Sequence, residues 1–321
     1  MVQWGLLSTA NINRALLAGI AQVEGARAAV VGSRDPERAR AYAAEHGIER
    51  AHGSYEALLA DPGVDAVYIS LPNSMHHEWT LKALEAGKHV LCEKPYSRHP
   101  ADVEQAFDLA AARGLVLMEA FMYRHNPQTR RVAELVAGGT LGHLRLVRSR
   151  FSFIAQPDDV RLRRDLDGGG LMDLGCYCVS GARLLAGEPE RAHAEQVLGG
   201  DGVDVVFAAT LRFPGDVFAY FDCSLALPDR SGLEVVCEQA SLYVPDPWHA
   251  RAPRIELRRR DGSIDVIAED PANSYALEVE NFGAAIGGEA APLLGRDDAL
   301  GQARAIEALY AAADSGNAVS L

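Results

Sequence analysis

Residues 3–13 run Gln-Trp-Gly-Leu-Leu-Ser-Thr-Ala-Asn-Ile-Asn, and this stretch decides the fold class. A short apolar segment leads through small and polar residues into a helix-like pattern that continues to about Gln22. In a dinucleotide-binding fold, the same strand–turn–helix carries three glycines that let the backbone approach a pyrophosphate. Here Ser8, Ala10 and Asn13 stand at those three positions. The stretch therefore indicates a nucleotide-binding turn, although a plain βα turn remains the alternative.

The alternation of apolar and helix-like segments continues through the first 125 residues. Spacing of this kind is typical of βαβ units, which form a parallel sheet with helices on both faces. The sequence therefore predicts a doubly wound Rossmann domain over 1–125. Its further strands are expected at 26–32, 66–71, 89–92 and 116–123, and its further helices at 36–46, 54–59, 77–86 and 100–113.

From about residue 140 the pattern changes to longer strands separated by turn residues such as Pro214-Gly215 and Asp261-Gly262. Hairpin-joined strands predict an α+β domain over 126–321 with an open, mostly antiparallel sheet. One helix, about 172–186, interrupts it. Two more close the chain and can pack back on the first domain. The expected strands are 144–153, 203–213, 217–225, 233–238 and 254–257, and the expected closing helices are 275–286 and 296–315.

Composition excludes several classes of protein. The 321 residues suggest about two domains. Against 31 Lys and Arg stand 44 Asp and Glu, a net charge of -13, so we expect neither nucleic acid nor membrane as a partner. No apolar run approaches the roughly 20 residues that span a bilayer, and no signal peptide is visible. The five cysteines include no Cys-x-x-Cys pair, so we expect reduced thiols, no metal site and a cytoplasmic location.

The end of the second expected strand indicates which dinucleotide binds. An NAD site usually places a carboxylate at this strand tip, where it accepts hydrogen bonds from the ribose hydroxyls. This chain has Ser33 and Arg34 there, with Arg38 one turn into the next helix. A hydroxyl beside a guanidinium suits a 2′-phosphate, because arginine forms charge-assisted and often bidentate bonds. The sequence therefore favours NADP, with NAD as a possibility.

Two further motifs follow expected parallel strands, at the edge where such a sheet opens toward a ligand. The first is Leu71-Pro72-Asn73 with His76, which by itself predicts only a turn; we expect His76 to line the cofactor pocket. The second is Cys92-Glu93-Lys94-Pro95. A lysine at a buried strand end is rarely packing material, and its ammonium can orient a substrate oxygen or lower the pKa of a neighbouring acid.

A glycine-rich segment, 168–170, leads into the helix expected after it, which carries Asp173 and Tyr177. Their i, i+4 spacing places a carboxylate and a phenol on one helical face, where both can flank one substrate. The alternative is an acidic residue favoured by the helix dipole and a core tyrosine.

Together, the turn at 8–13, Pro72-Asn73 with His76, Glu93-Lys94-Pro95 and the run that ends at Tyr177 resemble the Gfo/Idh/MocA oxidoreductase family. The resemblance covers nearly the whole chain. It implies hydride transfer between a nicotinamide cofactor and a carbinol carbon of a sugar, cyclitol or similar polyol. It also implies a site in the cleft between domains and a homodimer or homotetramer formed through the second sheet.

The resemblance assigns roles to individual residues. It implies that Lys94 and Tyr177 are catalytic and that Asp173 orients the substrate. Most members carry His at the position of Tyr177. With tyrosine there, this chain resembles the branch that contains dihydrodiol dehydrogenases, glucose–fructose oxidoreductase and D-xylose dehydrogenase-like proteins. Arg124 and Arg163 are added as substrate-binding candidates. The expected cofactor-binding residues are Ser8, Thr9, Ala10, Asn11, Ile12, Ser33, Arg34, Arg38, Leu71, Pro72, Asn73, His76, Glu93 and Lys94.

Several functions remain open at this point. The leading hypothesis is an NADP-dependent aldose 1-dehydrogenase acting on a D-xylose-like sugar. A ketosugar reductase or a trans-dihydrodiol dehydrogenase would use the same chemistry on another carbon. A redox-neutral enzyme would keep its cofactor bound and recycle the hydride. A sugar- or nucleotide-sensing protein without catalysis is disfavoured, because a sensor has no need for Lys94, Asp173 and Tyr177 together.

Overall fold

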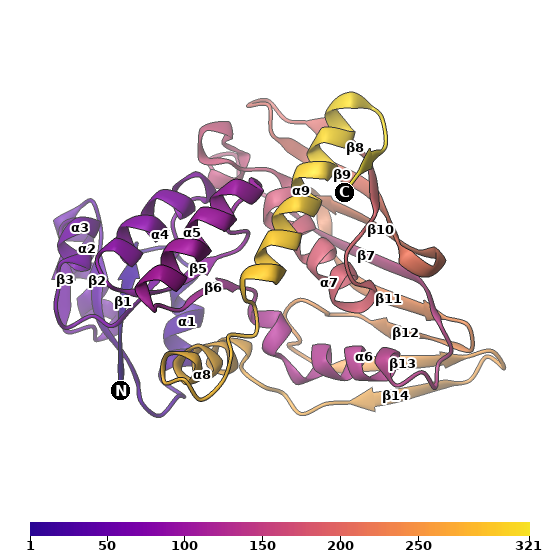
Figure 1. Ribbon diagram of the computed structural model, residues 1–321, viewed down its shortest axis with the longest axis horizontal. Coiled ribbons are helices and arrows are strands. Elements are labelled where there is room, and N and C mark those ends of the chain that lie inside the picture. Colours follow the sequence, from indigo (N-terminus) through magenta and orange to yellow (C-terminus); the bar gives the residue numbers. More distant parts are fainter. The chain divides into compact units, whose positions relative to one another are not determined.

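The computed structural model describes all 321 residues, which form two compact units. The first unit comprises residues 1–122 and 273–300, and the second comprises residues 123–272 and 301–321. Each unit is built around its own sheet, with six strands in the first and nine in the second (Figure 1). The predicted fold class, α/β with a Rossmann domain and a mostly antiparallel second sheet, is confirmed.

The first sheet is parallel throughout, in the order β3-β2-β1-β4-β5-β6. Its strands are β1 (Val2–Leu7), β2 (Ala26–Gly32), β3 (Arg50–His52), β4 (Ala66–Ile69), β5 (His89–Glu93) and β6 (Leu117–Ala120). Its helices are α1 (Asn13–Ile20), α2 (Pro36–His46), α3 (Tyr55–Leu59), α4 (His76–Glu85), α5 (Pro100–Arg113) and α8 (Ser274–Ile286), with a 3₁₀ turn η1 (Asn73–Met75).

Alternation along β1 assigns helices to the two faces of this sheet. The ring of Trp4 packs on Phe282 of α8, with ring centroids 5.2 Å apart. The next residue, Gly5, faces the other way, and a Cβ there would meet Leu58 of α3 at 2.8 Å. Helix α8 therefore covers one face and α3 the other. Local capping fixes α2, because Asp35 accepts hydrogen bonds from two backbone N–H groups and Gly47 ends the helix in the left-handed conformation.

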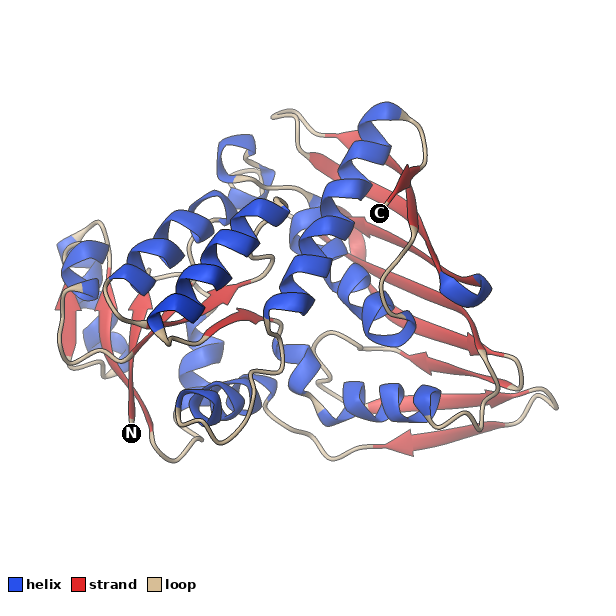
Figure 2. Cartoon of the chain, in the orientation of Figure 1, coloured by secondary structure: helices blue, strands red, loops and turns tan.

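The second sheet is mostly antiparallel, and only β7 and β10 pair in parallel. Its order is β14-β13-β12-β11-β7-β10-β9-β8-β15 (Figure 2). The strands are β7 (Leu144–Ile154), β8 (Arg191–Leu198), β9 (Asp204–Phe213), β10 (Val217–Ser224), β11 (Ala226–Cys237), β12 (Ala240–Val244), β13 (Arg254–Arg259), β14 (Ile264–Ala268) and β15 (Val319–Ser320).

Helices cover one face of the second sheet. On β10, Phe221 and Cys223 are buried toward the glycine-rich segment that precedes α7, whereas Phe218 and Tyr220 are exposed on the opposite face. The helical elements are α6 (Pro127–Ala137), the π-helix η5 (Leu171–Gly175), α7 (Cys176–Ala186) and α9 (Arg296–Ser315), with 3₁₀ turns η2 (Met122–His125), η3 (Val160–Leu162), η4 (Arg164–Leu166) and η6 (Pro214–Asp216).

Several elements differ from the sequence predictions. Strand β3 has only three residues, and β14 is an exposed edge strand, so neither carries a strong apolar pattern. Helix α6 was not expected, although Asn126 caps it and Pro127 begins it. The helix expected over 172–186 begins instead as a π-helix at Leu171 and continues as α7 from Cys176.

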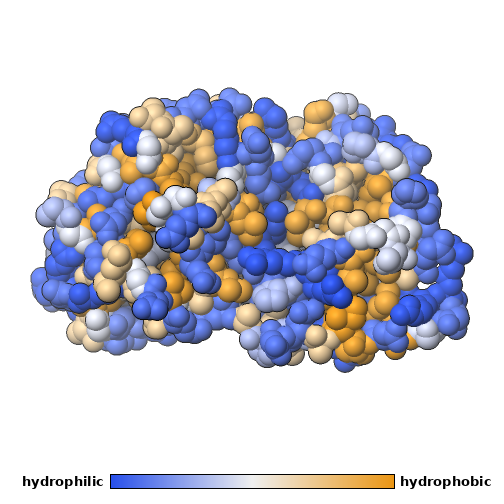
Figure 3. Space-filling model, turned by 60° about the horizontal axis from the view of Figure 1, so that its bottom comes forward, coloured by the Kyte–Doolittle hydropathy of each residue, from blue (hydrophilic) through white to orange (hydrophobic).

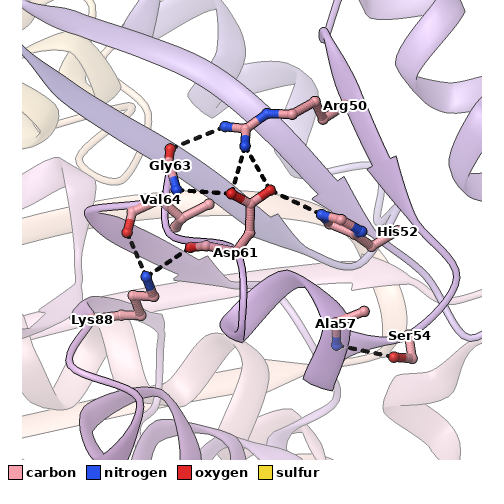
Figure 4. Close-up of polar contacts among 8 residues, drawn as sticks. All are labelled: Arg50, His52, Ser54, Ala57, Asp61, Gly63, Val64 and Lys88. Atoms are coloured by element: carbon pink, nitrogen blue, oxygen red, sulfur yellow. Dashed lines mark hydrogen bonds and ion pairs between the residues drawn. The ribbon is translucent and has the colours of Figure 1, made fainter.

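A partly buried ionic cluster lies at the amino-terminal edge of the first sheet (Figure 4). Asp61 accepts hydrogen bonds from Arg50 at 2.5 and 2.6 Å and from the backbone N–H of Gly63 at 2.8 Å, and it contacts His52 Nε2 at 2.9 Å. The ammonium of Lys88 donates to the carbonyl of Asp61 at 2.9 Å. Because cofactors bind at the opposite edge of such sheets, we assign this cluster to stability.

None of the helices is long and apolar enough to cross a bilayer. On the face drawn in Figure 3, hydrophilic side chains surround and separate smaller apolar areas.

Candidate functional site

The turn between β1 and α1 is held by a small hydrogen-bond network. Ser8 Oγ lies 2.8 Å from Ser70 Oγ and 3.1 Å from the backbone nitrogen of Ala10. The amide of Asn13 donates to the carbonyl of Ser8 at 2.8 Å, and its Oδ1 accepts from Ser70 Oγ at 2.6 Å. Asn13 therefore fills the space beside the turn that a third glycine would leave open.

This turn retains the backbone path that a pyrophosphate needs. Ser8 takes the place of the first glycine and has a φ of 136°, a conformation that glycine adopts more readily than serine. Helix α1 begins without a side-chain cap. The backbone N–H groups of its first three residues, Asn13, Arg14 and Ala15, donate instead to the carbonyls of Ala10, Asn11 and Ile12. The predicted contact of a dinucleotide phosphate with this turn, which comprises Ser8, Thr9, Ala10, Asn11 and Ile12, remains a prediction.

The end of β2 places two arginines at one tyrosine. Ser33 is buried, and its Oγ accepts from the backbone nitrogen of Asp35 at 3.2 Å. Arg34 and Arg38 are both exposed, and both act electrostatically on Tyr55 of α3. Burial raises the pKa of Tyr55, while the charge and hydrogen bond of Arg34 and the charge of Arg38 oppose that increase. Both guanidinium groups therefore lie near Tyr55, and their contact with a 2′-phosphate remains a prediction.

His76 connects two loops at the carboxyl edge. The side chain is fully buried, with Nε2 2.8 Å from the carbonyl of Leu71 and Nδ1 3.0 Å from the carbonyl of Pro95. Burial lowers the pKa of His76, and the two carbonyls oppose that decrease. The ring braces the loop that carries Pro72 and Asn73 against the loop that follows Lys94. Its predicted contact with a cofactor remains a prediction.

Glu93 and Lys94 lie at the carboxyl end of β5, beside a second buried carboxyl group. Glu93 accepts hydrogen bonds from the hydroxyl of Tyr68 and, at 3.2 Å, from the backbone nitrogen of Lys94. Glu278 of α8 is fully buried, and neither of its carboxyl oxygens has a hydrogen-bond partner. Burial, with the charge of Glu93, raises the pKa of Glu278 well above its ordinary value. The strand end therefore places the carboxyl group of Glu93 close to a second carboxyl group that favours its protonated form.

In the second unit, Asp173 and Tyr177 lie on consecutive parts of one helical segment. Asp173 belongs to the π-helix η5 and Tyr177 to the first turn of α7. Short π-helical segments occur frequently at functional sites. Tyr177 is buried among three aromatic rings, with centroids 5.6 Å from Tyr123, 5.6 Å from Phe151 and 5.9 Å from Trp248. These rings fix the orientation of the phenol.

Three arginines near the helical segment 171–186 have different hydrogen-bond partners. Arg161 Nε donates to Asp173 Oδ2 at 2.8 Å, and the charge of Asp173 raises the pKa of this guanidinium. Arg163 is exposed and pairs instead with Asp165 at 3.1 Å. Arg124 donates to Ser180 of α7 at 3.2 Å, one turn beyond Tyr177. The structure thus places Arg161 and Arg124, but not Arg163, against the segment that carries Asp173 and Tyr177.

Two residues that contact this helical segment, Arg161 and Asp204, were not identified by any sequence motif. Arg161 contacts Asp173 across 12 residues, and Asp204 accepts from the backbone nitrogen of Leu171 across 33 residues, at 2.7 Å. A helix-like spacing could not reveal either contact. Of the arginines just before the glycine-rich segment, the sequence analysis chose Arg163 as a candidate, whereas it is Arg161 that contacts Asp173.

An apolar pocket lies behind the aromatic rings of the second unit. Its empty volume, open solvent included, is about 300 Å³, and Tyr123, Val132, Leu184, Leu233 and Trp248 are among its lining residues. A sugar requires several polar anchors, which this mostly apolar lining does not supply. We therefore do not assign the substrate to this pocket.

Comparison with protein families matches both halves of the chain. Residues 4–121 match the model described as "Oxidoreductase family, NAD-binding Rossmann fold" of GFO_IDH_MocA. Residues 129–243 match the GFO/IDH/MocA C-terminal domain. The family predicted from the sequence is confirmed.

Individual relatives and a solved structure extend this result. The chain is 40% identical to "D-xylose 1-dehydrogenase (NADP(+)) 2" of Haloferax volcanii over 329 residues, which cover all of both chains. It is 34% identical to the trans-1,2-dihydrobenzene-1,2-diol dehydrogenase of Mus musculus, with 80% of each chain covered. A 3-ketoreductase from Actinomadura kijaniata, solved with NADP and TDP-benzene, is 30% identical, covers 97% of both chains and superposes with a TM-score of 0.91.

Proposed function

Because the chain belongs to the Gfo/Idh/MocA oxidoreductase family, we propose that it is an NADP-dependent dehydrogenase that oxidises an aldose at its anomeric carbon, with D-xylose as the reference substrate. The observation that carries the proposal is the helical segment 171–177. It presents Asp173, held by Arg161, and Tyr177, fixed among aromatic rings. The full-length similarity to a D-xylose 1-dehydrogenase supports the substrate class.

The proposed chemistry divides between three side chains. Tyr177 takes the proton of the reacting hydroxyl when the sugar is oxidised and returns it in the reverse direction. A free tyrosine has a pKa of about 10, so this role needs a positive charge, and the family resemblance assigns that charge to the ammonium of Lys94. Asp173 accepts a hydrogen bond from a second hydroxyl and fixes the orientation of the ring. The bound nicotinamide supplies the hydride acceptor or donor.

The proposed cofactor is NADP, in line with the NADP-dependent relative. The small residues of the turn at 8–12, together with the positive end of the α1 dipole, would hold the pyrophosphate. Ser33, Arg34 and Arg38 would hold the 2′-phosphate through a hydroxyl and two charge-assisted contacts. The loops that carry Asn73 and Lys94 would border the nicotinamide end of the site.

A second copy of the chain is the proposed partner of the open face of the second sheet. This face exposes Phe218 and Tyr220, which are 42% and 39% accessible. Arg212 lies over the ring of Phe218 and Arg148 over that of Tyr220, at 5.0 and 5.1 Å. Aromatic rings and arginines are enriched at protein interfaces. We further propose a cytoplasmic location, which the five buried free thiols support.

The test measures reduced nicotinamide absorbance with NADP⁺ and NAD⁺ against a panel of aldoses, cyclitols and diols. We expect one aldose to be oxidised much faster with NADP⁺ than with NAD⁺. Tyr177→Phe and Lys94→Met should each abolish turnover while NADPH binding, followed by fluorescence, is retained. Normal turnover in either variant would refute the assigned roles.

Reduction of a ketosugar is the second candidate function. It is favoured by the structural similarity to a 3-ketoreductase over 97% of the chain. Absence of oxidation across the panel, together with NADPH consumption on ketosugars, would support it. Oxidation of diols alone would indicate a dihydrodiol dehydrogenase instead. A purified protein that retains its cofactor and interconverts sugars without net reduction would indicate the redox-neutral cycle.

A further inference from the structure

The glycine-rich segment before η5 is shaped by one carboxylate, that of Asp204 on β9. Gly169 has a φ of 132°, and a Cβ at this position would collide with Asp204 Oδ1. A Cβ on Gly170 would lie 3.1 Å from Asp204 Oδ2. The close approach of this carboxylate to the backbone therefore accounts for glycine at both positions.

Asp204 also supplies the cap that the helical segment lacks locally. Gly170, at the start of η5, has no side chain to accept a hydrogen bond. Asp204 Oδ2 instead accepts from the backbone nitrogen of Leu171 at 2.7 Å. A negative charge at a helix start satisfies an orphan N–H group and interacts favourably with the helix dipole. The other oxygen, Oδ1, accepts from the hydroxyl of Tyr310 on α9 at 2.9 Å.

Water cannot replace a lost hydrogen-bond partner of Asp204, because the residue is only 2% exposed. Leu171 begins the segment that presents Asp173 two residues later and Tyr177 six residues later. We propose that Asp204 is a positioning residue, which holds the start of this segment so that Asp173 and Tyr177 face the substrate together. The catalytic roles of Asp173 and Tyr177 in this inference rest on the proposed function. The expected effect of Asp204 on the position of the segment does not.

The charge of Asp204 links this positioning to pH. Burial raises the pKa of Asp204 to about 6, although the hydrogen bonds from Leu171 and Tyr310 lower it in part. The titratable groups that face it are Tyr310 from α9 and the thiol of Cys223 from β10. Below about pH 6 the carboxylate gains a proton and becomes a weaker acceptor for the N–H of Leu171. We therefore expect kcat to decline as pH falls through this value.

Two variants test the inference in the full-length protein. Asp204→Asn keeps the shape and one acceptor oxygen but removes the charge. We expect its kcat to be several-fold lower at pH 8 and to lack the decline near pH 6. Asp204→Ala removes both acceptors, so kcat should fall by about tenfold to a hundredfold, the cost of a small misplacement at a reacting centre. The NADPH dissociation constant should not change in either variant.

Amide hydrogen exchange over residues 169–177 gives a readout that does not depend on turnover. Exchange should accelerate in Asp204→Ala and less in Asp204→Asn. Asp61→Asn is the matched control, because it neutralises another buried carboxylate that accepts a backbone N–H. It should lower stability while leaving the exchange of 169–177 and the pH profile of kcat at wild-type values.

The outcomes separate this inference from the proposed function. If Asp204→Ala folds with wild-type exchange over 169–177 and wild-type kcat, the positioning role is wrong. If exchange accelerates as expected but Tyr177→Phe retains full turnover, Asp204 positions the segment and the role assigned to Tyr177 fails instead. Persistence of the decline near pH 6 in Asp204→Asn would overturn the link to pH.

Discussion

Two buried carboxyl groups of the first unit, Asp61 and Glu278, have opposite environments. Asp61, at the amino-terminal edge of the sheet, is contacted by Arg50, His52 and the N–H of Gly63. Burial alone would raise its pKa, but these hydrogen bonds outweigh burial, and the pKa of Asp61 lies below its ordinary value. Both oxygens of Glu278 lack partners, and its pKa is raised well above its ordinary value.

The difference separates the part of the sheet that supports the fold from the part that supports chemistry. A carboxylate with all its partners stabilises the native state, whereas a buried group with a raised pKa costs stability and tends to occur at functional sites. Glu278 lies in the electrostatic field of Glu93, which directly precedes Lys94. We therefore expect changes at the carboxyl edge to alter activity and changes at the amino edge to alter stability.

The largest effect is expected at Lys94. Lys94→Met should lower kcat about a thousandfold, because the substitution removes the charge that the proposed acid/base chemistry requires. The free energy of unfolding should change by no more than about 0.5 kcal/mol, since Lys94 is only partly buried. Steady-state kinetics and urea denaturation measure the two quantities. Lys82→Met removes an equally partly buried lysine of α4, which pairs with Glu78, and should leave kcat unchanged. A stability loss in Lys94→Met as large as its activity loss would contradict the assignment of the carboxyl edge to activity.

The next largest effect is expected at Asp61, where the substitution should lower stability and leave activity unchanged. Asp61→Ala should lower the free energy of unfolding by about 2–3 kcal/mol at pH 7, because it leaves Arg50 without its partner; the partial exposure of Arg50 keeps the loss at the low end for a broken buried pair. Turnover per folded molecule should not change. Because the pKa of Asp61 is lowered in the native state, its stabilisation is present above the ordinary pKa of an aspartate and is lost as pH falls through the native value.

Urea denaturation at pH 7 and pH 3 checks this sign, and the gap between wild type and Asp61→Ala should shrink at the lower pH. The matched control is Asp108→Ala, which removes an exposed carboxylate that pairs with Arg296. Surface pairs contribute about 0–1 kcal/mol, so this variant should lose little stability. Equal losses in the two variants would contradict the assignment of the Asp61 cluster to stability.

At the carboxyl edge, Arg34→Ala should change which cofactor is preferred. Loss of one charge-assisted hydrogen bond to the 2′-phosphate costs about 1.5–3 kcal/mol, which corresponds to roughly tenfold to a hundredfold in KM for NADP⁺. The KM for NAD⁺ should hardly change. Arg40→Ala, on the helix that follows Arg34 and paired with Glu37, is the control. A parallel rise in both KM values would mean that Arg34 does not contact the 2′-phosphate.

The sequence predicts the first sheet well because its information is local. Each buried strand is a short apolar run, and the caps Asp35 and Gly47 mark the ends of α2 within a few residues. The second sheet is harder, since β8 buries only two small alanines, Ala192 and Ala194, before its pattern fades. The parallel pairing of β7 with β10 joins segments about 70 residues apart and has no local pattern.

Prediction of the site succeeds and fails for the same reason. Lys94, Asp173 and Tyr177 stand in short motifs, so their residue types and spacing identify them as candidates. Arg161 and Asp204 act on those motifs through contacts made only after folding. Glu278 is still less visible, because a glutamate within an amphipathic helix is normally solvated, and only packing against the sheet buries it.

The smallest effect is expected for Glu278→Gln, which tests the contrast between the environments of Glu278 and Asp61. The native state favours protonated Glu278, so its contribution to stability is greatest below the ordinary pKa of a glutamate and is lost as pH rises toward the raised native value. Glutamine has the same shape and no proton to bind, but its amide is equally short of partners. We expect Glu278→Gln to gain about 1 kcal/mol at pH 6 and the gain to widen at pH 7, as measured by urea denaturation. A gain that does not depend on pH would show that Glu278 is ionised in the native state, and the contrast with Asp61 would then lie in hydrogen bonding alone.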